Sequence, residues 1–416
     1  MNCPIHISTP PTDNVAMTVE PDPSMPRLAL DPFSPQVLEN PFPAHAALRD
    51  AGPVVWLPAI GCYAMARFDH VQAALKNWQI YGSGRGVGLS DFARETPWRP
   101  PSLLLETDPP IHDRTRGLMN RVASLAALRK LMPQWQEKAM SLVSAYADGQ
   151  PFDAIPAVAE GFPLSVFPDL IGLRDEGRDN LIPYATVAFN AFGPRNALLA
   201  EAMKAAEGAT LWVAESCKRE NLKPGGWGMQ VYQAADDGLC THDEAERLVR
   251  SFLTAGVDTT VNGIATLLHG FAQFPGEYQR LRGDRALLRK AIEESLRWGG
   301  TIQTFFRTTS QAVEVEGNVI PEGAKVLLFL AAANRDPRHW DQPERFDIGR
   351  NASGHVGFGF GIHQCLGQMV ARMEMEAMTG ALLAHVAEIR ATGPIEYRLN
   401  NTLRAIGALP IAFVPA

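Results

Sequence analysis

A single cysteine, Cys365, stands among five glycines in the segment GHVGFGFGIHQCLGQ, residues 354 to 368. Glycine tolerates backbone angles and close approaches that other residues resist, so this density indicates a loop pressed against another group. Cys365 and His363 could both bind zinc, but a structural zinc site needs four ligands, commonly in CxxC or HxxxH pairs, which the sequence lacks. A cysteine–histidine nucleophile is a second interpretation, although it needs no glycines on both sides. The third is a thiolate bound to haem iron, where glycines let the loop lie against the porphyrin.

A second set of chemical groups interrupts the longest helical pattern, which begins at Glu244 and runs to residue 274. The stretch AGVDTT, residues 255 to 260, places one carboxylate and two hydroxyls among apolar neighbours. Asp and Thr are poor helix formers because their side chains compete for backbone groups. A glycine with a threonine that bonds back to the helix can open the hydrogen-bond ladder. The stretch therefore predicts either a partly solvated kink or a groove that holds a small ligand and relays protons.

Two charged pairs also have helical spacing. Glu294 and Arg297 are three residues apart and share one helix face. His112 and Arg116 are four residues apart, follow the extended stretch TDPPI, and could clamp an anion. Taken singly, such pairs are usually solvated and contribute little to stability, so the sequence leaves their role open.

The elements that must position these groups are mostly helical. Strand pairs are predicted within residues 52 to 68, GPVVWLPAIGCYAMARF, and within residues 312 to 330, AVEVEGNVIPEGAKVLLFL. The fold class that follows is mainly α with a minor β region. Long helical patterns cover residues 128–148, 196–219, 244–274, 285–298 and 368–387.

Composition limits the function. The 416 residues are 46% hydrophobic and 20% charged, which is ordinary for a globular protein. A net charge of −7 argues against a nucleic-acid surface. Five scattered cysteines without a CxxC indicate a reducing cytosol, and neither a secretory signal nor a long apolar run is present, so we expect a cytoplasmic protein without membrane contact. Residues 1–26 lack periodicity and predict a mobile tail, followed by a single domain over 27–416.

The stretch FGFGIHQCLG, residues 358 to 367, matches the pattern FGxGxHxCxG of the cysteine loop of the cytochrome P450 family. That pattern is ten residues long and highly specific. The sequences NRDP at 334–337 and PERF at 343–346 are similar to the usual approach to this loop. The resemblance extends from about residue 27 to the end of the chain. It implies a P450 fold with haem b between the long central helix and the cysteine loop, with Cys365 as the axial thiolate.

The other signals occur in the family's order, and the resemblance implies a role for each. Asp258 and Thr259 are implied to deliver protons to oxygen, and Glu294 with Arg297 to form a buried structural pair. The implied activity is insertion of one oxygen atom from O2 into a substrate. Electrons would come from an iron–sulfur ferredoxin and a flavin-containing ferredoxin reductase that uses NADH, docking on the cysteine face. The residues implied to bind haem are His112, Arg116, Arg307, His355, Phe358, Gly359 and Gly367.

Five stretches resemble the bacterial P450 branch that oxidises para-substituted benzoic acids such as 4-methoxybenzoate. They are WRPPSLLLETDPP, FNAFGP, RSFLTAGVDTT, QTFFRTT and NNTLRA. The resemblance implies that Arg99, Ser102, Arg250 and Ser251 bind the substrate carboxylate. The implied cavity walls are Leu105, Phe189, Phe192, Ala255, Ile302 and Phe305.

Helical geometry bears on which substituent is oxidised. Ser251 precedes Ala255 by one helical turn, about 6 Å, so an acid held near Ser251 would place its para group over the iron. The chain departs from the family after Arg297, where it reads WGGT, so residues 299 to 301 are expected to be more flexible.

Alternatives remain at this point. Peroxide-driven peroxygenases of the family share the thiolate but lack the acid–alcohol pair that stands here as Asp258 and Thr259. A haem-binding sensor would not need that pair, and a zinc hydrolase would be revealed by metal analysis. Within the oxygenase interpretation, the alternative substrate is a different small aromatic or a terpenoid.

Overall fold

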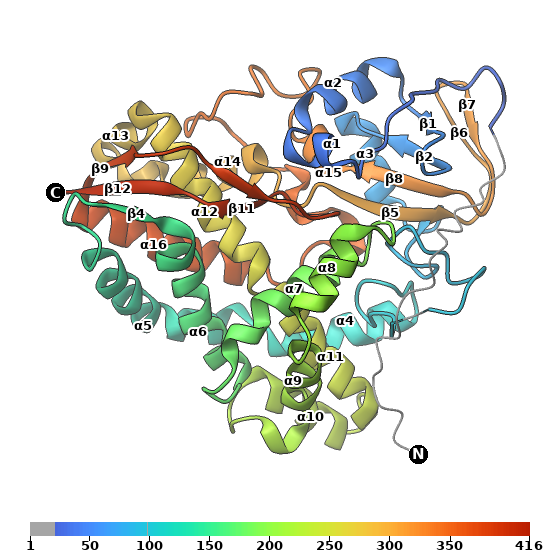
Figure 1. The fold of residues 1–416 in the computed structure, drawn as a ribbon. Helices are drawn as coiled ribbons and strands as arrows, with labels where there is room; N and C mark the ends of the chain where they lie inside the picture. The colour runs from blue at the N-terminus through green and yellow to red at the C-terminus, as the bar shows by residue number, and fades with distance from the viewer. Residues whose placement is uncertain (1–20, 98) are drawn as a thin grey trace.

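The computed structural model describes residues 21–97 and 99–416, and helices dominate it (Figure 1). The prediction of a mainly α protein with a minor β region is therefore confirmed. Within the described residues, no helix combines the length and apolar character needed to cross a membrane. The α-helices are α1 Pro35–Glu39, α2 Phe42–Ala51, α3 Phe68–Lys76, α4 Ile111–Val122, α5 Leu125–Ser144, α6 Gly161–Ile171, α7 Leu181–Asn190, α8 Ala197–Ala205, α9 Ala209–Ser216, α10 Trp227–Asp236, α11 His242–Ala255, α12 Asp258–Gln273, α13 Pro275–Gly283, α14 Leu288–Gly299, α15 Leu330–Ala333 and α16 Gln368–His385.

The strands form one larger sheet and three small ones. The larger sheet has the order β1-β2-β8-β5-β3, in which β2 and β8 are parallel and the other neighbours antiparallel. In Figure 1 this sheet lies beside α1, α2 and α3, apart from the main helical body. Both predicted strand regions are confirmed. The strands are β1 Val55–Leu57, β2 Cys62–Met65, β3 Tyr81–Gly82, β4 Pro151–Asp153, β5 Thr304–Thr309, β6 Val313–Val315, β7 Asn318–Ile320, β8 Lys325–Phe329, β9 Val386–Ala391, β10 Glu396–Arg398, β11 Ala405–Ala408 and β12 Pro410–Pro415.

Helix α12 runs through the middle of the helical body (Figure 1) and is covered on all sides. It packs against α14, α16 and the six-residue π-helix Ile155–Glu160, and α16 packs in turn against α5. A helix that is apolar all round belongs in the core of a large domain. The fully covered side chains on α12 include Val261, Ile264, Leu267, Leu268 and Phe271.

The longest predicted helix, 244–274, is in fact two helices. Helix α11 begins with a capping box, in which the Thr241 hydroxyl and the Glu244 carboxylate each accept a backbone N–H from the other residue. It ends at Ala255, and α12 begins at Asp258, so the break falls inside the AGVDTT stretch. The predicted helix 196–219 is likewise divided into α8 and α9 by Gly208, whose φ of 88° favours glycine.

The Glu294–Arg297 pair on α14 is buried, and neither side chain is exposed. Arg297 binds Glu294 through Nε at 2.7 Å and Nη2 at 2.8 Å, and its Nη1 donates to the carbonyls of Asn334 and Pro343. The pair thus ties α14 to the segment that leads to the cysteine loop. The structural role predicted for these two residues agrees with this geometry.

Two local expectations differ from the structure. Residues 1–20 of the predicted tail 1–26 lie outside the described residues, but Met25 is 4% exposed and packs in the core, so the packed chain begins earlier than 27. The departure at 299–301, expected to be flexible, is tightly packed. A Cβ on Gly299 would lie 2.2 Å from Cγ2 of Thr266, and one on Gly300 would lie 2.8 Å from Cβ of Ala331.

Candidate active site

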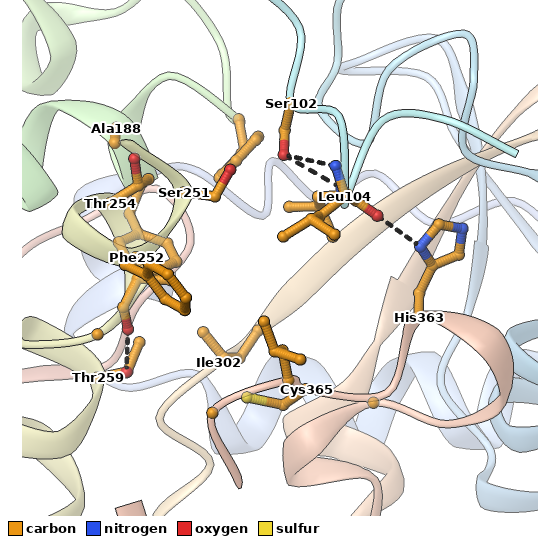
Figure 2. Close-up of a pocket in the computed structure, with 18 of the residues that line it drawn as sticks. Ser102, Leu104, Ala188, Ser251, Phe252, Thr254, Thr259, Ile302, His363 and Cys365 are labelled. Carbon is orange, nitrogen blue, oxygen red and sulfur yellow. Dashed lines mark hydrogen bonds between the residues drawn. The ribbon is translucent and has the colours of Figure 1, made fainter. Parts of the chain in front are cut away.

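One cavity brings together most of the predicted site residues (Figure 2). It lies between α7, α11, α12, the segment 99–105, strand β5 and the loop that carries Cys365. The predicted residues that border it are Arg99, Ser102, Leu105, Arg116, Phe189, Phe192, Arg250, Ser251, Ala255, Thr259, Ile302, Phe305, Arg307, Phe358, Gly359, Cys365 and Gly367. Asp258, His112 and His355 are predicted site residues that do not border it.

The Cys365 loop is closed by its own backbone. The Cys365 N–H donates to the carbonyl of Phe358 at 2.8 Å. Gly359 and Gly361 adopt φ angles of 69° and 72°, in the left-handed region that favours glycine. A Cβ on Gly361 would also lie 2.6 Å from the carbonyl oxygen of Leu75. The glycines therefore allow a tight turn that presents the sulfur to the cavity, as Figure 2 shows.

The surroundings of the sulfur act on the Cys365 pKa in both directions, and burial has the larger effect. Burial raises the pKa of the Cys365 thiol, while the backbone N–H groups of Gly367 and Gln368 and the charges of Arg116 and Arg372 lower it. Such N–H groups tune the electron donation of a thiolate ligand. Cys62, Cys217 and Cys240 are free and buried within the core, and they do not border the cavity.

The break between α11 and α12 forms a groove in the cavity wall. Thr259 Oγ1 donates to the carbonyl of Ala255 at 2.6 Å, and both residues border the cavity (Figure 2). A Cβ on Gly256 would lie 1.9 Å from the Phe167 ring, so this position is confined to glycine. The AGVDTT stretch therefore breaks the helix at the cavity wall, and the ligand-binding and proton-relay part of its interpretation stays a prediction.

Asp258 faces away from this groove. Its Oδ1 accepts from Arg398 Nη2 at 2.7 Å and from Asn262 Nδ2 at 3.1 Å, whereas Oδ2 is buried without a partner. Burial raises the pKa of Asp258, although Arg398 and Asn262 pull it down. The Arg398 side chain is 33% exposed, so it lies between the buried acid and the protein surface. This contact is absent from the sequence-based expectations, because 140 residues separate the two partners.

Five arginines border the cavity, and among the residues that the structure describes no aspartate or glutamate does. Arg99 and Arg250 have acidic partners, Glu106 and Glu246 respectively. For Arg116, Arg247 and Arg307, no carboxylate of the described chain lies within 4.0 Å of a guanidinium nitrogen. The cavity therefore carries excess positive charge.

Two of these unpaired arginines lie near Cys365 together with two histidines. Arg307 is 3% exposed, donates only to the neighbouring carbonyl of Phe306, and burial lowers its pKa to about 10. The Nε2 atom of His112 is buried without a hydrogen-bond partner, and that of His363 lies 3.7 Å from Asp108 Oδ1, beyond hydrogen-bond distance. The two ring centroids are 4.5 Å apart. Haem b carries two propionates, and Arg307, His112 and His363 together with Arg116 fit them as donors of charge-assisted hydrogen bonds.

His355 does not belong to this set. Its Nδ1 accepts the N–H of Gly357 at 3.0 Å and its Nε2 lies 3.2 Å from Glu293 Oε2. Both ring nitrogens are therefore occupied by protein groups, so the prediction of His355 as a haem-binding residue is wrong. His363 does border the cavity, and its Nε2 has no hydrogen-bond partner among the described residues. It stands within the FGxGxHxCxG pattern, so that pattern could have identified it.

The far end of the cavity is polar and aromatic. Arg99 forms a bidentate pair with Glu106, at 2.7 and 2.6 Å, and lies 5.0 Å over the Phe192 ring. Glu106 is fully buried behind the wall and also accepts the N–H of Ser102. Arg99 thus borders the cavity as predicted, but its charge is already balanced.

The two predicted serines lie on the side of the cavity away from Cys365 (Figure 2). Ser102 Oγ accepts the N–H groups of Leu104 and Leu105, which leaves its own proton free to donate. Ser251 Oγ donates to the carbonyl of Arg247 at 3.1 Å.

Aromatic rings form the wall between the two ends of the cavity. Phe192 packs edge-on against Phe189 and Phe305, at 6.1 and 5.6 Å between centroids. Phe305 and Arg307 alternate along β5 and face the cavity together, whereas Phe306 between them is buried in the core behind. The walls predicted for a flat ring are therefore present.

Known proteins with similar sequences identify the family. The chain is 50% identical over 393 residues to Cytochrome p450 CYP199A2 of Rhodopseudomonas palustris, across 94% of this chain and 95% of that protein. It is 31% identical over 394 residues to the beta-dihydromenaquinone-9 omega-hydroxylase of Mycobacterium tuberculosis, across 92% of this chain and 78% of that protein. The Cytochrome P450 family model matches residues 227–387. This chain belongs to the cytochrome P450 family.

A solved P450 structure supports the same conclusion about the fold. Cytochrome P450 CYP109Q5 from Chondromyces apiculatus shares the fold at a TM-score of 0.78 with 27% identity, over 94% of this chain and 99% of that one. The P450 fold predicted from the sequence is therefore confirmed. As a member of the family, the protein is a monooxygenase that uses haem b with a cysteine thiolate as axial ligand.

Proposed function

We propose that this P450 inserts one oxygen atom from O2 into the para substituent of a small benzoic acid, with O-demethylation of 4-methoxybenzoate as the representative reaction. The observation that carries the proposal is the division of one cavity into two ends. Cys365 and Thr259 lie at one end, and Ser102 and Ser251 lie at the other (Figure 2). Arg99 and Arg250 are near these serines in the chain and also border the cavity, as do Phe189, Phe192 and Phe305. A ring with a carboxylate at one end and a para group at the other matches this order.

The distances on α11 support the para position. Ser251 precedes Ala255 by one helical turn, about 6 Å along the axis, and both border the cavity. One aromatic ring with its carboxyl carbon and para atom spans about that length. An acid held at Ser251 and Ser102 therefore presents its para substituent to the groove beside Thr259, while a meta substituent would face the aromatic wall.

The haem contacts are part of the same proposal. Haem, when bound with a thiolate ligand, supplies the activation of O2 and the cleavage of the O–O bond. Cys365 holds the iron, and Arg116, Arg307, His112 and His363 hold the propionates. Phe358, Gly359 and Gly367 border the haem side of the cavity, where glycines allow close contact.

Thr259 and Asp258 divide the proton transfer between them. The Thr259 hydroxyl lies at the cavity wall and orders water there, while Asp258 lies behind it with a pKa that burial raises, so that it holds its proton more readily than an exposed carboxyl does. Because Asp258 is held by Arg398, the acid must leave that contact to reach Thr259. Arg398 therefore controls the supply of protons from the surface.

The electron donors are proposed to be a ferredoxin and its flavin-containing reductase, which draws on NADH, in the cytoplasm. The stoichiometry is then one O2, one NADH and one proton per 4-methoxybenzoate, yielding 4-hydroxybenzoate, formaldehyde and water. The free state of Cys62, Cys217 and Cys240 is compatible with a reducing compartment.

The test is a binding screen of the haem-loaded enzyme followed by product analysis. We expect 4-methoxybenzoate to displace the iron-bound water, seen as a shift of the Soret band, and to yield formaldehyde and 4-hydroxybenzoate with a ferredoxin system and NADH. The matched control is 3-methoxybenzoate, which should bind but give little product. A terpenoid that binds more tightly than any benzoate, or equal product from the two isomers, contradicts the proposal.

A further inference from the structure

Helix α11 presents one arginine to the cavity whose charge no acid balances. Arg247 and Ser251 are four residues apart on one helix face, and both border the cavity. Arg247 Nη2 donates to the carbonyl of Pro101 at 2.7 Å, and its Nε is buried without an acceptor. Burial, together with the charge of Arg250, lowers the pKa of Arg247. A buried N–H donor without an acceptor carries a free-energy cost that an anionic ligand would remove.

The glutamates around Arg247 already have other partners. Glu246 pairs with Arg250 at 3.3 Å, four residues along the helix. Glu244 binds Arg114 through both carboxylate oxygens and caps the helix as well. Asp243, one helical turn before Arg247, is exposed and acts on it through its charge without an ion pair within 4.0 Å. Glu106, which accepts the N–H of Ser102 next to Pro101, is held by Arg99 in a bidentate pair. In the described chain, the neutral Pro101 carbonyl is therefore the hydrogen-bond acceptor of Arg247, and no carboxylate lies within 4.0 Å of its guanidinium nitrogens.

Counting the charged groups around the cavity also leads to Arg247. Of the five arginines that border it, Arg99 and Arg250 are paired, and Arg116 with Arg307 match the two haem propionates. One positive charge is then left for a substrate, and it belongs to Arg247. Both serines are linked to Arg247: Ser251 Oγ donates to the Arg247 carbonyl, and Ser102 directly follows Pro101, whose carbonyl accepts from Arg247.

We propose that Arg247 is the residue that selects carboxylate substrates, with its Nε as donor and its charge as counter-ion. This inference rests on the proposed function and changes one part of it, the role of Arg99. The Arg99 charge is neutralised by Glu106, so Arg99 shapes the cavity and Arg247 binds the carboxylate. The contact with Pro101 also joins α11 to the segment 99–105. A carboxylate at Arg247 therefore fixes that segment over the ring, which an uncharged analogue does not do.

The experiment compares acids with their amides in the haem-loaded enzyme. The dissociation constants of 4-methoxybenzoate and 4-methoxybenzamide are measured by Soret titration for the wild type, Arg247→Gln, Arg247→Lys and Arg219→Gln. Arg219 is the control because it pairs with Asp236 on the surface and does not border the cavity. We expect Arg247→Gln to weaken acid binding about 10- to 100-fold and amide binding less than about twofold. Arg247→Lys should recover part of the loss, and Arg219→Gln should change neither constant.

Other outcomes decide against the inference or separate it from the proposed function. Equal weakening of acid and amide by Arg247→Gln would show that the residue only anchors Pro101, and unchanged acid binding would also overturn the inference. The acid–amide pairs of cyclohexanecarboxylic and octanoic acid are measured in parallel. If only these bind, and Arg247→Gln removes the preference for the acid, the benzoate proposal fails while the inference stands. If no acid is preferred over its amide in the wild type, both fail.

Discussion

Thr259 and Asp258 follow one another in the chain, yet only the threonine borders the cavity. Successive residues at the start of α12 point in different directions, so the hydroxyl meets the groove and the carboxylate meets Arg398. The two side chains therefore have different tasks. In the proposed mechanism, Thr259 orders water in the cavity and Asp258 supplies protons from behind the cavity wall.

Thr259→Ala removes the hydroxyl from the groove without creating a large cavity. We expect substrate affinity to change less than about threefold, because the carboxylate end is untouched, while reducing equivalents are diverted into hydrogen peroxide. The ratio of product to NADH consumed and the peroxide yield measure this. The matched control is Thr260→Ala, on the neighbouring position, whose hydroxyl makes a longer 3.4 Å contact with the Gly256 carbonyl. Equal coupling in wild type and Thr259→Ala would remove the threonine from the relay.

Glu374 on α16 is a second unusual residue, because it is fully buried and neither carboxylate oxygen has a partner. Burial raises its pKa well above the ordinary value. Between the unfolded pKa, about 4.3, and this raised value, the folded chain holds the extra proton, so stability falls as pH rises through that window. We expect a slope of up to about −1.4 kcal/mol per pH unit from this group. Urea unfolding of wild type and Glu374→Gln from pH 5 to 8 tests it, since the variant should lack this contribution and gain relative stability at the higher pH.

At the scale of elements, the break between α11 and α12 depends on how α6 packs beneath it. A Cβ on Gly256 would lie 1.9 Å from the Phe167 ring of α6, so the two elements are in direct contact there. Gly256 lets the two helices separate, and the Thr259 hydroxyl then donates a hydrogen bond to the carbonyl of Ala255. The groove is therefore a product of close packing as well as of the helix-breaking residues.

Gly256→Ala tests this packing. We expect a loss of about 1–3 kcal/mol in the free energy of unfolding, because the ring must move, together with weaker substrate binding. The control is Gly380→Ala on the exposed side of α16, where a Cβ meets nothing within 4 Å. That change should stabilise the protein by about 0.5–1 kcal/mol, since alanine favours a helix. Chemical unfolding of the three proteins measures both signs. A neutral Gly256→Ala would show that α6 moves aside freely.

At the scale of the whole molecule, haem binding and folding are linked through buried charge. Arg307 comes from β5 of the larger sheet, and Cys365 comes from the loop before α16, so a haem held as proposed would join the sheet region to the helical body. Arg307 is buried and unpaired in the protein itself. Anything that binds the folded chain alone stabilises it by mass action.

Removal of haem is therefore expected to lower the melting temperature, and Arg307→Gln should reduce the difference between the two forms. In the haem-free protein, the variant relieves an unpaired buried charge and gains roughly 1–3 kcal/mol. In the loaded protein, it loses a propionate contact and releases haem faster. Thermal unfolding of both forms of wild type and variant gives the comparison. If Arg307→Gln lowers the stability equally with and without haem, then Arg307 stabilises the sheet and does not bind the cofactor.

Local patterns in the sequence determined the family, the mainly α class and most residues that border the cavity. FGFGIHQCLG and AGVDTT are short, so their chemistry and their turns depend on neighbours a few residues away. Helical and strand periods also act over short ranges, which explains why both strand regions were predicted correctly. The helix over 244–274 was predicted as one element because the pattern continues past Gly256, whereas the contact that divides it comes from Phe167.

The tertiary structure alone decided which charges are paired. Arg99 and Arg250 were both predicted at the carboxylate site, but Glu106 and Glu246 balance them, and Arg247 is left without an acid. His355 was predicted to bind haem, but its Nε2 contacts the carboxylate of Glu293 on α14. Electrostatic interactions fall off with distance and depend on burial, and the fold sets both by bringing together segments far apart in the chain. The sequence therefore named the groups that could do the chemistry, and packing decided which of them are free to do it.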